Sequence, residues 1–459
     1  MAVNVISLNS NLTKYDLMFI NNSIYLYIKV VIFITLGLSP FFCYGNNNRT
    51  PYQIVQNESD FLTNYSESYI KSVKAYKTGR ELNNPIIELK SDETITVEFD
   101  DLSDESTSFD YTILHCTYDW KPSNVIFMDF SDGFEYNRVD KYTNSLGTST
   151  SYIHYSLTLP NSNINLKISG NYILRIVDSY DHSKVVLQQR FMVVEPILAM
   201  DARVRQPVIL DFLKTSQQLE LEVNFSPLGN INPTTDIVTV VSQNNQLDNQ
   251  VNVLKPQYIS PKSIRYSAPD ALIFDGCNEY RAFNLKSFYY QIPQIRRIEN
   301  YGGEIHVNLT PDIDNHNQDY VENPDLNGKY IIKRDDSNDS NTEAEYAWVY
   351  FTLKTEELYN SDVYLYGEIT GLKINPEYKL NFNHNANVYE TRVPLKQGYY
   401  NYRYVVVDRQ TGKINHSQLE GNHFATENSY QIFTYYKSPG IRYWRLVGMK
   451  GVSSRYSAN

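Results

Sequence analysis

One short stretch of the chain decides the fold class: residues 170–177 read GNYILRIV. A Gly-Asn turn pair leads into β-branched and aromatic residues, which is the composition typical of strands. Residues 185–194 continue in the same manner and are nearly all apolar, apart from Gln188, Gln189 and Arg190. Pro196 then ends the pattern, because proline cannot extend a central strand. Strand-length runs separated by turn signals predict a β-sandwich.

The composition favours strands along the whole chain. The 459 residues include 40 tyrosines, and aromatic residues make up 14% of the total. Tyrosine suits a half-buried pleated surface, where the ring packs and the hydroxyl reaches water. A hydrophobic content of 42% is enough to bury a core, and no long segment has a helical period. The formal net charge of -11 argues against nucleic acid as a partner, because phosphate binding requires a basic face.

Residues 1–45 are typical of a secretory signal peptide. An apolar run over residues 25–42 is followed by Cys43-Tyr44-Gly45, which places small residues where a signal peptidase cleaves. Translation from Met18 would give a signal of more ordinary length. The alternative is a membrane anchor, although the apolar core is short and Pro40 lies near its end. No later run is long enough to span a bilayer, so we expect no transmembrane segment after signal removal.

Strand patterns and polar breaks divide the remaining chain into units. Alternation of Leu219, Leu221 and Val223 with polar residues marks one strand with a wet face. A second alternating run starts at Tyr346. The expected units are a polar leader (46–72), a first sandwich (73–196), a second β-rich domain (197–312), a polar connecting segment (313–345), a C-terminal sandwich (346–437) and a tail (438–459).

The sequence contains no recognisable catalytic signature. Neither a nucleophile elbow, nor a zinc-protease motif, nor a phosphate-binding loop is present. His115 and Cys116 are adjacent on a predicted strand, so their side chains should point to opposite faces rather than form a catalytic pair. Cys116 and Cys277 are buried thiols or, in an oxidising compartment, a disulfide. We therefore expect no enzymatic activity and no cofactor.

The acidic run over residues 335–343 is the best candidate for a metal site. Its oxygen-bearing side chains have the alternate spacing of a calcium loop. The glycine that bends an EF-hand loop is missing, and a solvated turn rich in Asp and Asn explains the run equally well. We therefore expect no metal.

The C-terminal unit is similar to the glycogen-binding sandwich modules that accompany some sugar enzymes and kinases. The similarity rests on residues 363–367, which read VYLYG, and on residues 395–406, which read LKQGYYNYRYVV. Those modules carry a sugar-stacking tryptophan shortly after the glycine, whereas residues 368–372 contain none. The fold we expect is therefore all-β, with tandem sandwiches of the immunoglobulin-like or E-set-like type, and without that stacking platform.

A set of runs in a fixed order resembles the plug protein family of the type IX secretion system. The runs that carry this resemblance are KAYKTG (74–79), HCTYDW (115–120), residues 172–196, RDDSNDSNTE (334–343), LKQGYYNY (395–402) and EGNHFATEN (420–428). The resemblance implies a periplasmic protein without enzymatic activity, held at the inner side of the outer membrane. Its implied partner is a giant outer-membrane β-barrel translocon, whose periplasmic opening it closes when no cargo is engaged.

Two polar excursions between strands are the candidate contact loops, because loops carry recognition on sandwich scaffolds. The candidate partner-binding residues are Asp335, Asp336, Asp339 and Glu343 in one loop, and Glu368, Leu372 and Tyr378 in the other. The alternative function is that of a periplasmic or surface glycan-binding protein, which an exposed groove lined by Trp or Tyr would support.

Overall fold

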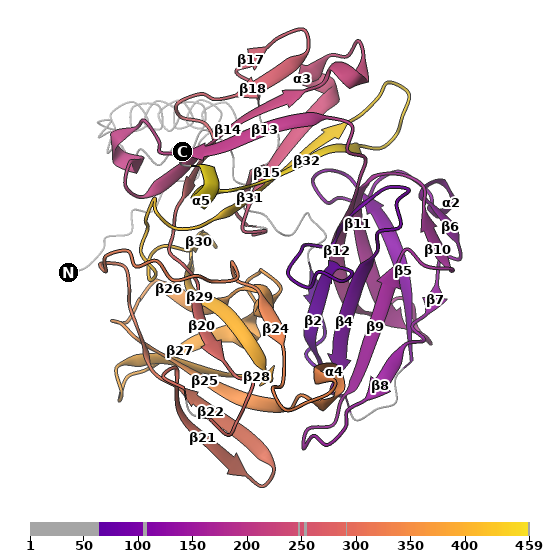
Figure 1. Ribbon diagram of the computed structural model, residues 1–459. Coiled ribbons are helices and arrows are strands. Elements are labelled where there is room, and N and C mark those ends of the chain that lie inside the picture. The colour runs from indigo at the N-terminus through magenta and orange to yellow at the C-terminus, as the bar shows by residue number, and fades with distance from the viewer. Residues whose placement is uncertain (1–63, 104–107, 247, 252–254, 291, 458–459) are drawn as a thin grey trace, which may run out of the picture. The chain divides into compact units, whose positions relative to one another are not determined.

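The computed structural model describes residues 64–457, with the exception of 104–107, 247, 252–254 and 291. The expected signal peptide lies outside these residues, as does most of the expected leader. Three groups of strands, which we call the first, second and third units, make up the described part of the chain (Figure 1).

The first unit consists of two main sheets around one core, drawn in indigo and purple in Figure 1. One sheet has the order β1 (Tyr65–Ser66), β12 (Val185–Val194), β11 (Gly170–Asp178), β5 (Phe109–Cys116) and β7 (Asn137–Arg138), with β3 (Ile86–Glu88) also on β12. The other has the order β2 (Ile70–Lys77), β4 (Ile95–Asp101), β9 (Ile153–Leu159) and β8 (Tyr142–Asn144). A short ribbon of β6 (Ser131–Gly133) and β10 (Ile164–Leu166) follows helix α2 (Phe127–Phe130). The GNYILRIV stretch forms β11, the central strand that the sequence predicts.

The second unit also has two sheets, but it draws on both halves of the chain. The first sheet contains β13 (Ala199–Arg205), β14 (Ser216–Asn224), β18 (Ser263–Tyr266) and β17 (Tyr258–Ile259), with β19 (Ile273–Asp275) on β14. The second contains β16 (Gln250–Val251), β15 (Ile237–Gln243), β31 (Ser429–Tyr436) and β32 (Arg445–Ser453). Residues 430–436 were expected in the C-terminal sandwich (346–437), and residues 445–453 in the tail after it. Instead they pair beside β15, because their apolar faces complete the second core.

The third unit is a single eleven-stranded sheet that curls into a nearly closed barrel around its own core. Its main path is β20 (Arg281–Asn284), β29 (Gly398–Asp408), β26 (Ser361–Tyr366), β27 (Lys379–Asn383), β28 (Val388–Lys396), β25 (Tyr346–Lys354), β22 (Glu304–Leu309) and β21 (Ile295–Tyr301). Short strands β23 (Asp312–Ile313), β24 (Tyr330–Ile332) and β30 (Ile414–Asn415) pair with β25 or β29. Residues 281–309, expected in the second domain, thus belong to this sheet.

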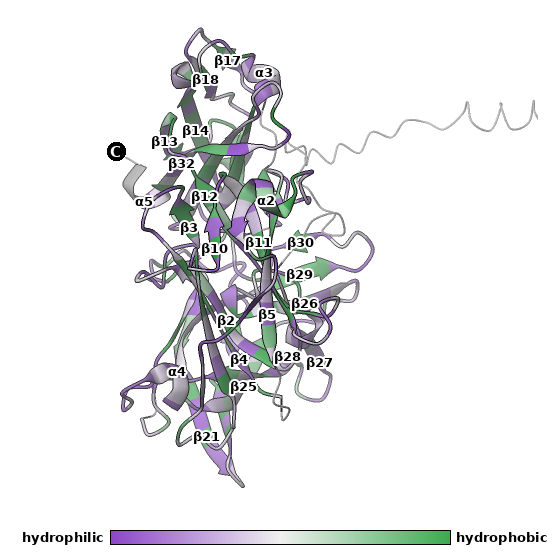
Figure 2. Ribbon diagram, turned by 90° about the vertical axis from the view of Figure 1, so that its right-hand side faces the viewer, coloured by the Kyte–Doolittle hydropathy of each residue, from purple (hydrophilic) through white to green (hydrophobic). Residues whose placement is uncertain are grey.

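The expectation of a mostly β protein with little helix is confirmed for the described residues. The α-helices there are α2, α3 (Pro233–Asp236), α4 (Ser340–Glu343) and α5 (Ser454–Ser457), each of four residues. Hydrophobic colour is concentrated on the strands and hydrophilic colour on the loops (Figure 2). Within the described residues, no helix has the length and apolar character needed to cross a membrane. The immunoglobulin-like type of the sandwiches and the likeness to glycogen-binding modules stay predictions.

Candidate functional site

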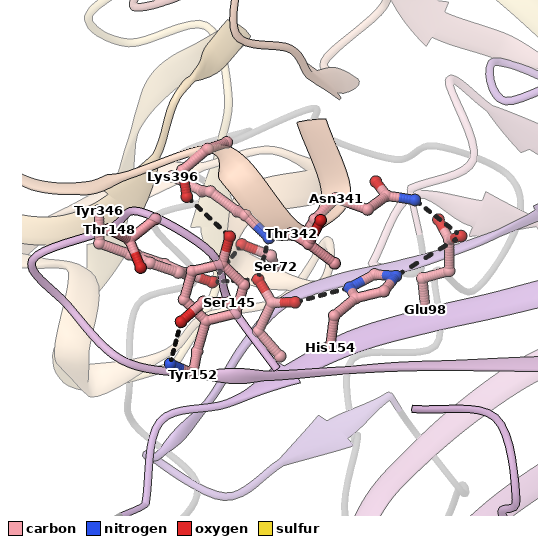
Figure 3. A network of polar contacts seen from close by, with 12 residues as sticks. Ser72, Glu98, Ser145, Thr148, Tyr152, His154, Asn341, Thr342, Tyr346 and Lys396 are labelled. Carbon is pink, nitrogen blue, oxygen red and sulfur yellow. Dashed lines mark hydrogen bonds and ion pairs between the residues drawn. The ribbon is translucent and has the colours of Figure 1, made fainter. Parts of the chain in front are cut away.

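Charged side chains are buried where the first unit meets the third. The Asp100 carboxylate lies 2.6 Å from the Lys396 ammonium, and each side chain is only 1% exposed. The second Asp100 oxygen is 2.7 Å from Nδ1 of His154, whose Nε2 is 3.8 Å from Glu98. Tyr346 donates its hydroxyl to Asp100 at 2.7 Å. We call these five residues the junction cluster (Figure 3).

Strand alternation explains how these charges arrive at the junction. Neighbouring residues on a strand face opposite ways, so a core residue is followed or preceded by one that faces outward. Phe99, Tyr155 and Leu395 belong to the cores of their units. Asp100, His154 and Lys396 are their sequence neighbours and meet between the units.

Helix α4 closes the junction from one side. Lys396 donates to the carbonyl of Asn341 at 2.6 Å, and the Tyr152 hydroxyl donates to the carbonyl of Ala344 at 2.8 Å. Glu345 accepts hydrogen bonds from the backbone of Ser149 and of Thr150, both in the first unit. The loop that carries α4 therefore fastens the third unit to the first.

This same loop contains four of the candidate contact residues. Asp339 caps α4 by accepting from Asn341 N at 3.0 Å and from the Thr342 hydroxyl at 3.0 Å. Glu343 accepts from Asn338 N at 3.2 Å. Asp336 pairs with Arg334 at 2.8 Å, while Asp335 is exposed. Within the described residues, no three His, Cys, Asp or Glu side chains are grouped so that they could hold a metal ion.

The other three candidate residues line a pocket bounded by all three units, which we call the central pocket. Its volume is about 140 Å³. Glu368 accepts from Tyr330 N at 3.1 Å, and one of its oxygens lies 3.9 Å from the Lys74 ammonium. Leu372 and Tyr378 are 8% and 6% exposed. The structure brings Glu368, Leu372 and Tyr378 together, but on the pocket wall rather than on an open loop.

Strained backbone surrounds the central pocket. Ser72, Trp120, Asn245 and Leu372 all line it, and they have φ values of 50°, 62°, 58° and 58°. Positive φ costs free energy in residues other than glycine, most of all in bulky ones. The guanidinium of Arg190 lies 4.4 Å from the centre of the Trp120 ring and covers it. Such strain persists only where surrounding contacts impose it, and it is concentrated at sites that clamp ligands.

Comparison with known proteins gives the family. Residues 70–195 match the family described as Type 9 secretion system plug protein 1st domain. The chain belongs to this plug protein family. The match runs from β2 to the end of β12 and so covers the first unit apart from β1.

A solved structure extends the likeness of this plug-family chain beyond its first unit. The crystal structure of a hypothetical protein from Parabacteroides merdae ATCC 43184 is 32% identical, with a TM-score of 0.83. The alignment covers 86% of this chain and 99% of that one. A second structure, trypsin-activated alpha-2-macroglobulin from Escherichia coli, is 7% identical with a TM-score of 0.17 over 86% of this chain and 29% of that one, which carries no fold information. No curated protein matches the sequence significantly.

The HCTYDW motif of the plug-family domain has a structural role. His115 is hydrogen-bonded to the Ser123 hydroxyl at 2.7 Å and to the Ser169 carbonyl at 3.3 Å. Burial lowers the pKa of His115 to about 4. Burial raises the pKa of Cys116 to about 12. Both Cys116 and Cys277 are free and buried, so the alternative of a disulfide is not realised. His115 and Cys116 therefore do not form a nucleophilic thiol–imidazole pair.

No sequence pattern predicted the junction cluster. A charged residue inside a strand such as Asp100 or Lys396 reads locally as a solvent-facing position. Such a residue is a weak signal for a buried site, because the sequence alone does not show that a second sheet covers that face of the strand. The one available signal is that charges of opposite sign occur within two strands: Glu98 and Asp100 in β4, and Lys396 in β28. Their opposite signs are compatible with an ion pair between these strands.

Attraction between opposite charges in the cluster opposes the effect of burial, which disfavours the charged forms. Burial opposes ionisation of Asp100, but Lys396 and His154 outweigh it and lower the pKa of this carboxyl. Burial also opposes the charge on His154, yet its hydrogen bond to Asp100 and the Glu98 carboxylate 3.8 Å away raise its pKa to about 9. Burial lowers the pKa of Lys396 below its ordinary value, although Asp100 favours the ammonium. At neutral pH, His154 is therefore expected to be protonated.

This shift predicts that stability falls in alkaline solution. The pKa of His154 is higher in the folded chain than the ordinary 6.5, so the folded state binds the extra proton. The stabilisation is complete below pH 6.5 and is lost as pH rises toward 9. A shift of this size corresponds to about 3 kcal/mol. Urea unfolding at pH 6 and pH 9.5 should show a larger loss for the native chain than for His154→Gln. Equal losses in both proteins would contradict the assignment.

Proposed function

We propose that this chain is a non-enzymatic periplasmic plug that binds the periplasmic opening of the type IX translocon barrel. It closes this opening when no cargo is engaged. The observation that carries the proposal is the plug-protein first domain over residues 70–195. A pore wide enough for folded cargo would leak solutes if it stood open, and a rigid protein can cover it without chemistry.

The fastening of the units supports such a role. A cover for a wide pore must hold its shape, and the junction cluster ties the first unit to the third through a fully buried ion pair. The first and second units are joined by Arg445 and Glu195, whose charged groups lie 2.5 Å apart. Tyr435 of the second unit also donates its hydroxyl to Asn171 of the first at 2.7 Å. The contacts that are buried, in the junction cluster and between Tyr435 and Asn171, fix geometry most strictly, because an unpaired buried group would be costly.

For contact with the barrel we favour the exposed acidic tip of the 335–343 loop. Asp335 and Asp336 are exposed and accessible to a partner. Asp339 and Glu343 are committed to α4, and Glu368, Leu372 and Tyr378 face the central pocket. We therefore propose Asp335 and Asp336 as contact residues and the other five as residues that hold the two loops in place.

Deletion of the gene tests the proposed function directly. We expect the deletion strain to admit large antibiotics that the outer membrane normally excludes, while secretion of cargo continues. Removal of the barrel together with this chain should restore exclusion, because the leak requires the open pore. The readout is the minimal inhibitory concentration of such an antibiotic in the single and double deletion strains. Unchanged permeability combined with failed uptake or degradation of a polysaccharide would instead support a glycan-binding protein.

A further inference from the structure

The wall of the central pocket offers hydrogen-bonding groups that the fold does not use. No side-chain hydrogen bond joins Gln189, Asn245 or Gln250 to another residue of the described chain, although all three line the pocket. Each side-chain amide can donate two hydrogen bonds and accept others. These are the complementary partners for the N–H and C=O groups of a peptide backbone. Asn245 has a positive φ of 58°, a backbone conformation that asparagine adopts more readily than most other residues.

The charged side chains of the pocket are engaged with other groups. Lys71 forms an ion pair with Glu377, both on the wall. Glu368 accepts from Tyr330 N and faces Lys74. Arg190 stacks on Trp120. A charged ligand would have to break one of these contacts or remain without a partner, so the pocket selects an uncharged one.

Apolar side chains from all three units complete the wall. They include Met192 of the first unit, Phe433 of the second, and Leu372, Tyr378 and Leu395 of the third. Binding sites of this kind combine an apolar lining with a few polar groups that set orientation, and they occur preferentially where domains meet. A volume of about 140 Å³ accommodates one or two side chains rather than a folded element.

We propose that the central pocket binds an extended, uncharged peptide segment of another polypeptide. The amides of Gln189, Asn245 and Gln250 recognise its backbone, and one of its apolar side chains packs among Leu372, Tyr378 and Phe433. Because the three units all contribute, a bound segment also holds them together. This binding activity goes beyond closure of a pore and does not depend on it.

The test uses the full mature chain and two defined probes. The first is an acetylated and amidated heptapeptide of alternating serine and leucine, and the second has aspartate in place of each leucine. We expect saturable binding of the first alone in isothermal titration calorimetry. Gln189→Ala and Asn245→Gly should each weaken it about tenfold, since each removes hydrogen bonds to the backbone. Glycine suits the positive φ at position 245, so this variant should fold normally.

Gln410→Ala is the matched control, because this exposed amide lies outside the pocket. It should bind as the native chain does. Melting temperatures of the three variants within about 2 °C of the native value would show that the fold is intact. Equal binding of both probes, or unchanged binding by Gln189→Ala and Asn245→Gly, would overturn the proposal. Binding that appears only after removal of residues 1–63 would also overturn it, since a segment of this chain would then be the occupant.

Discussion

Asp100→Asn is expected to lower the free energy of unfolding by about 3–5 kcal/mol, because it leaves the buried Lys396 ammonium without a charged partner. The two groups lie 2.6 Å apart and are both 1% exposed, so water cannot replace the lost carboxylate. The substitution also removes part of the negative charge that raises the pKa of His154. Urea unfolding followed by tryptophan fluorescence measures the change.

An exposed ion pair provides the control. Arg409 lies 2.7 Å from Asp362 and is 56% exposed. Arg409→Gln should therefore leave the free energy of unfolding nearly unchanged. The double variant Asp100→Asn with Lys396→Met should recover part of the loss, because no uncompensated charge remains. A cost for Asp100→Asn no larger than that of the control would refute the role of the junction cluster.

Removal of residues 438–459 should unfold the second unit. This truncation deletes β32, which pairs along the whole of β31 and buries Leu446 and Val447 completely. Those two side chains alone contribute about 3–6 kcal/mol. The linker that follows the first unit also depends on β32, since Glu195 N donates to the carbonyl of Leu446 at 2.8 Å and Leu198 N to that of Val447 at 3.0 Å.

Limited proteolysis with mass spectrometry is the measurement for this truncation. We expect rapid cleavage between residues 197 and 280, while the first unit resists. A chain that lacks only residues 458–459 should resist throughout and serves as the control. Resistance of the longer truncation would mean that the second unit does not rely on its last strand.

Local patterns in the sequence were sufficient for the strands but not for their partners. The alternation of Leu219, Leu221 and Val223 predicts β14, and the apolar run over 185–194 predicts β12. Both follow from the two-residue period of a strand. The pairing of β15 with β31 has no local signature, because it depends on which apolar edges remain open after the intervening chain has folded. For that reason the expected unit boundaries at 312 and 437 differ from the observed sheets.

The candidate site could be predicted from the sequence only in part, for the same reason. The loops around Asp339 and Leu372 could be recognised as polar excursions between strands. Their contacts could not, since Asp339 turns toward α4 and Leu372 toward the pocket only when the units are packed. Whether the tandem domains are of the immunoglobulin-like type is still a prediction.

The placement of β31 has a consequence for how the chain is made. Synthesis proceeds from the N-terminus, so β15 is complete before the entire third unit, whereas β31 is added after it. All seven positions of β15 are buried in the finished protein. Until β31 arrives, this apolar strand has an open edge of the kind that promotes mispairing and aggregation. The nascent chain should therefore need a holding chaperone up to its last few dozen residues, and the second unit should be the last part to become native.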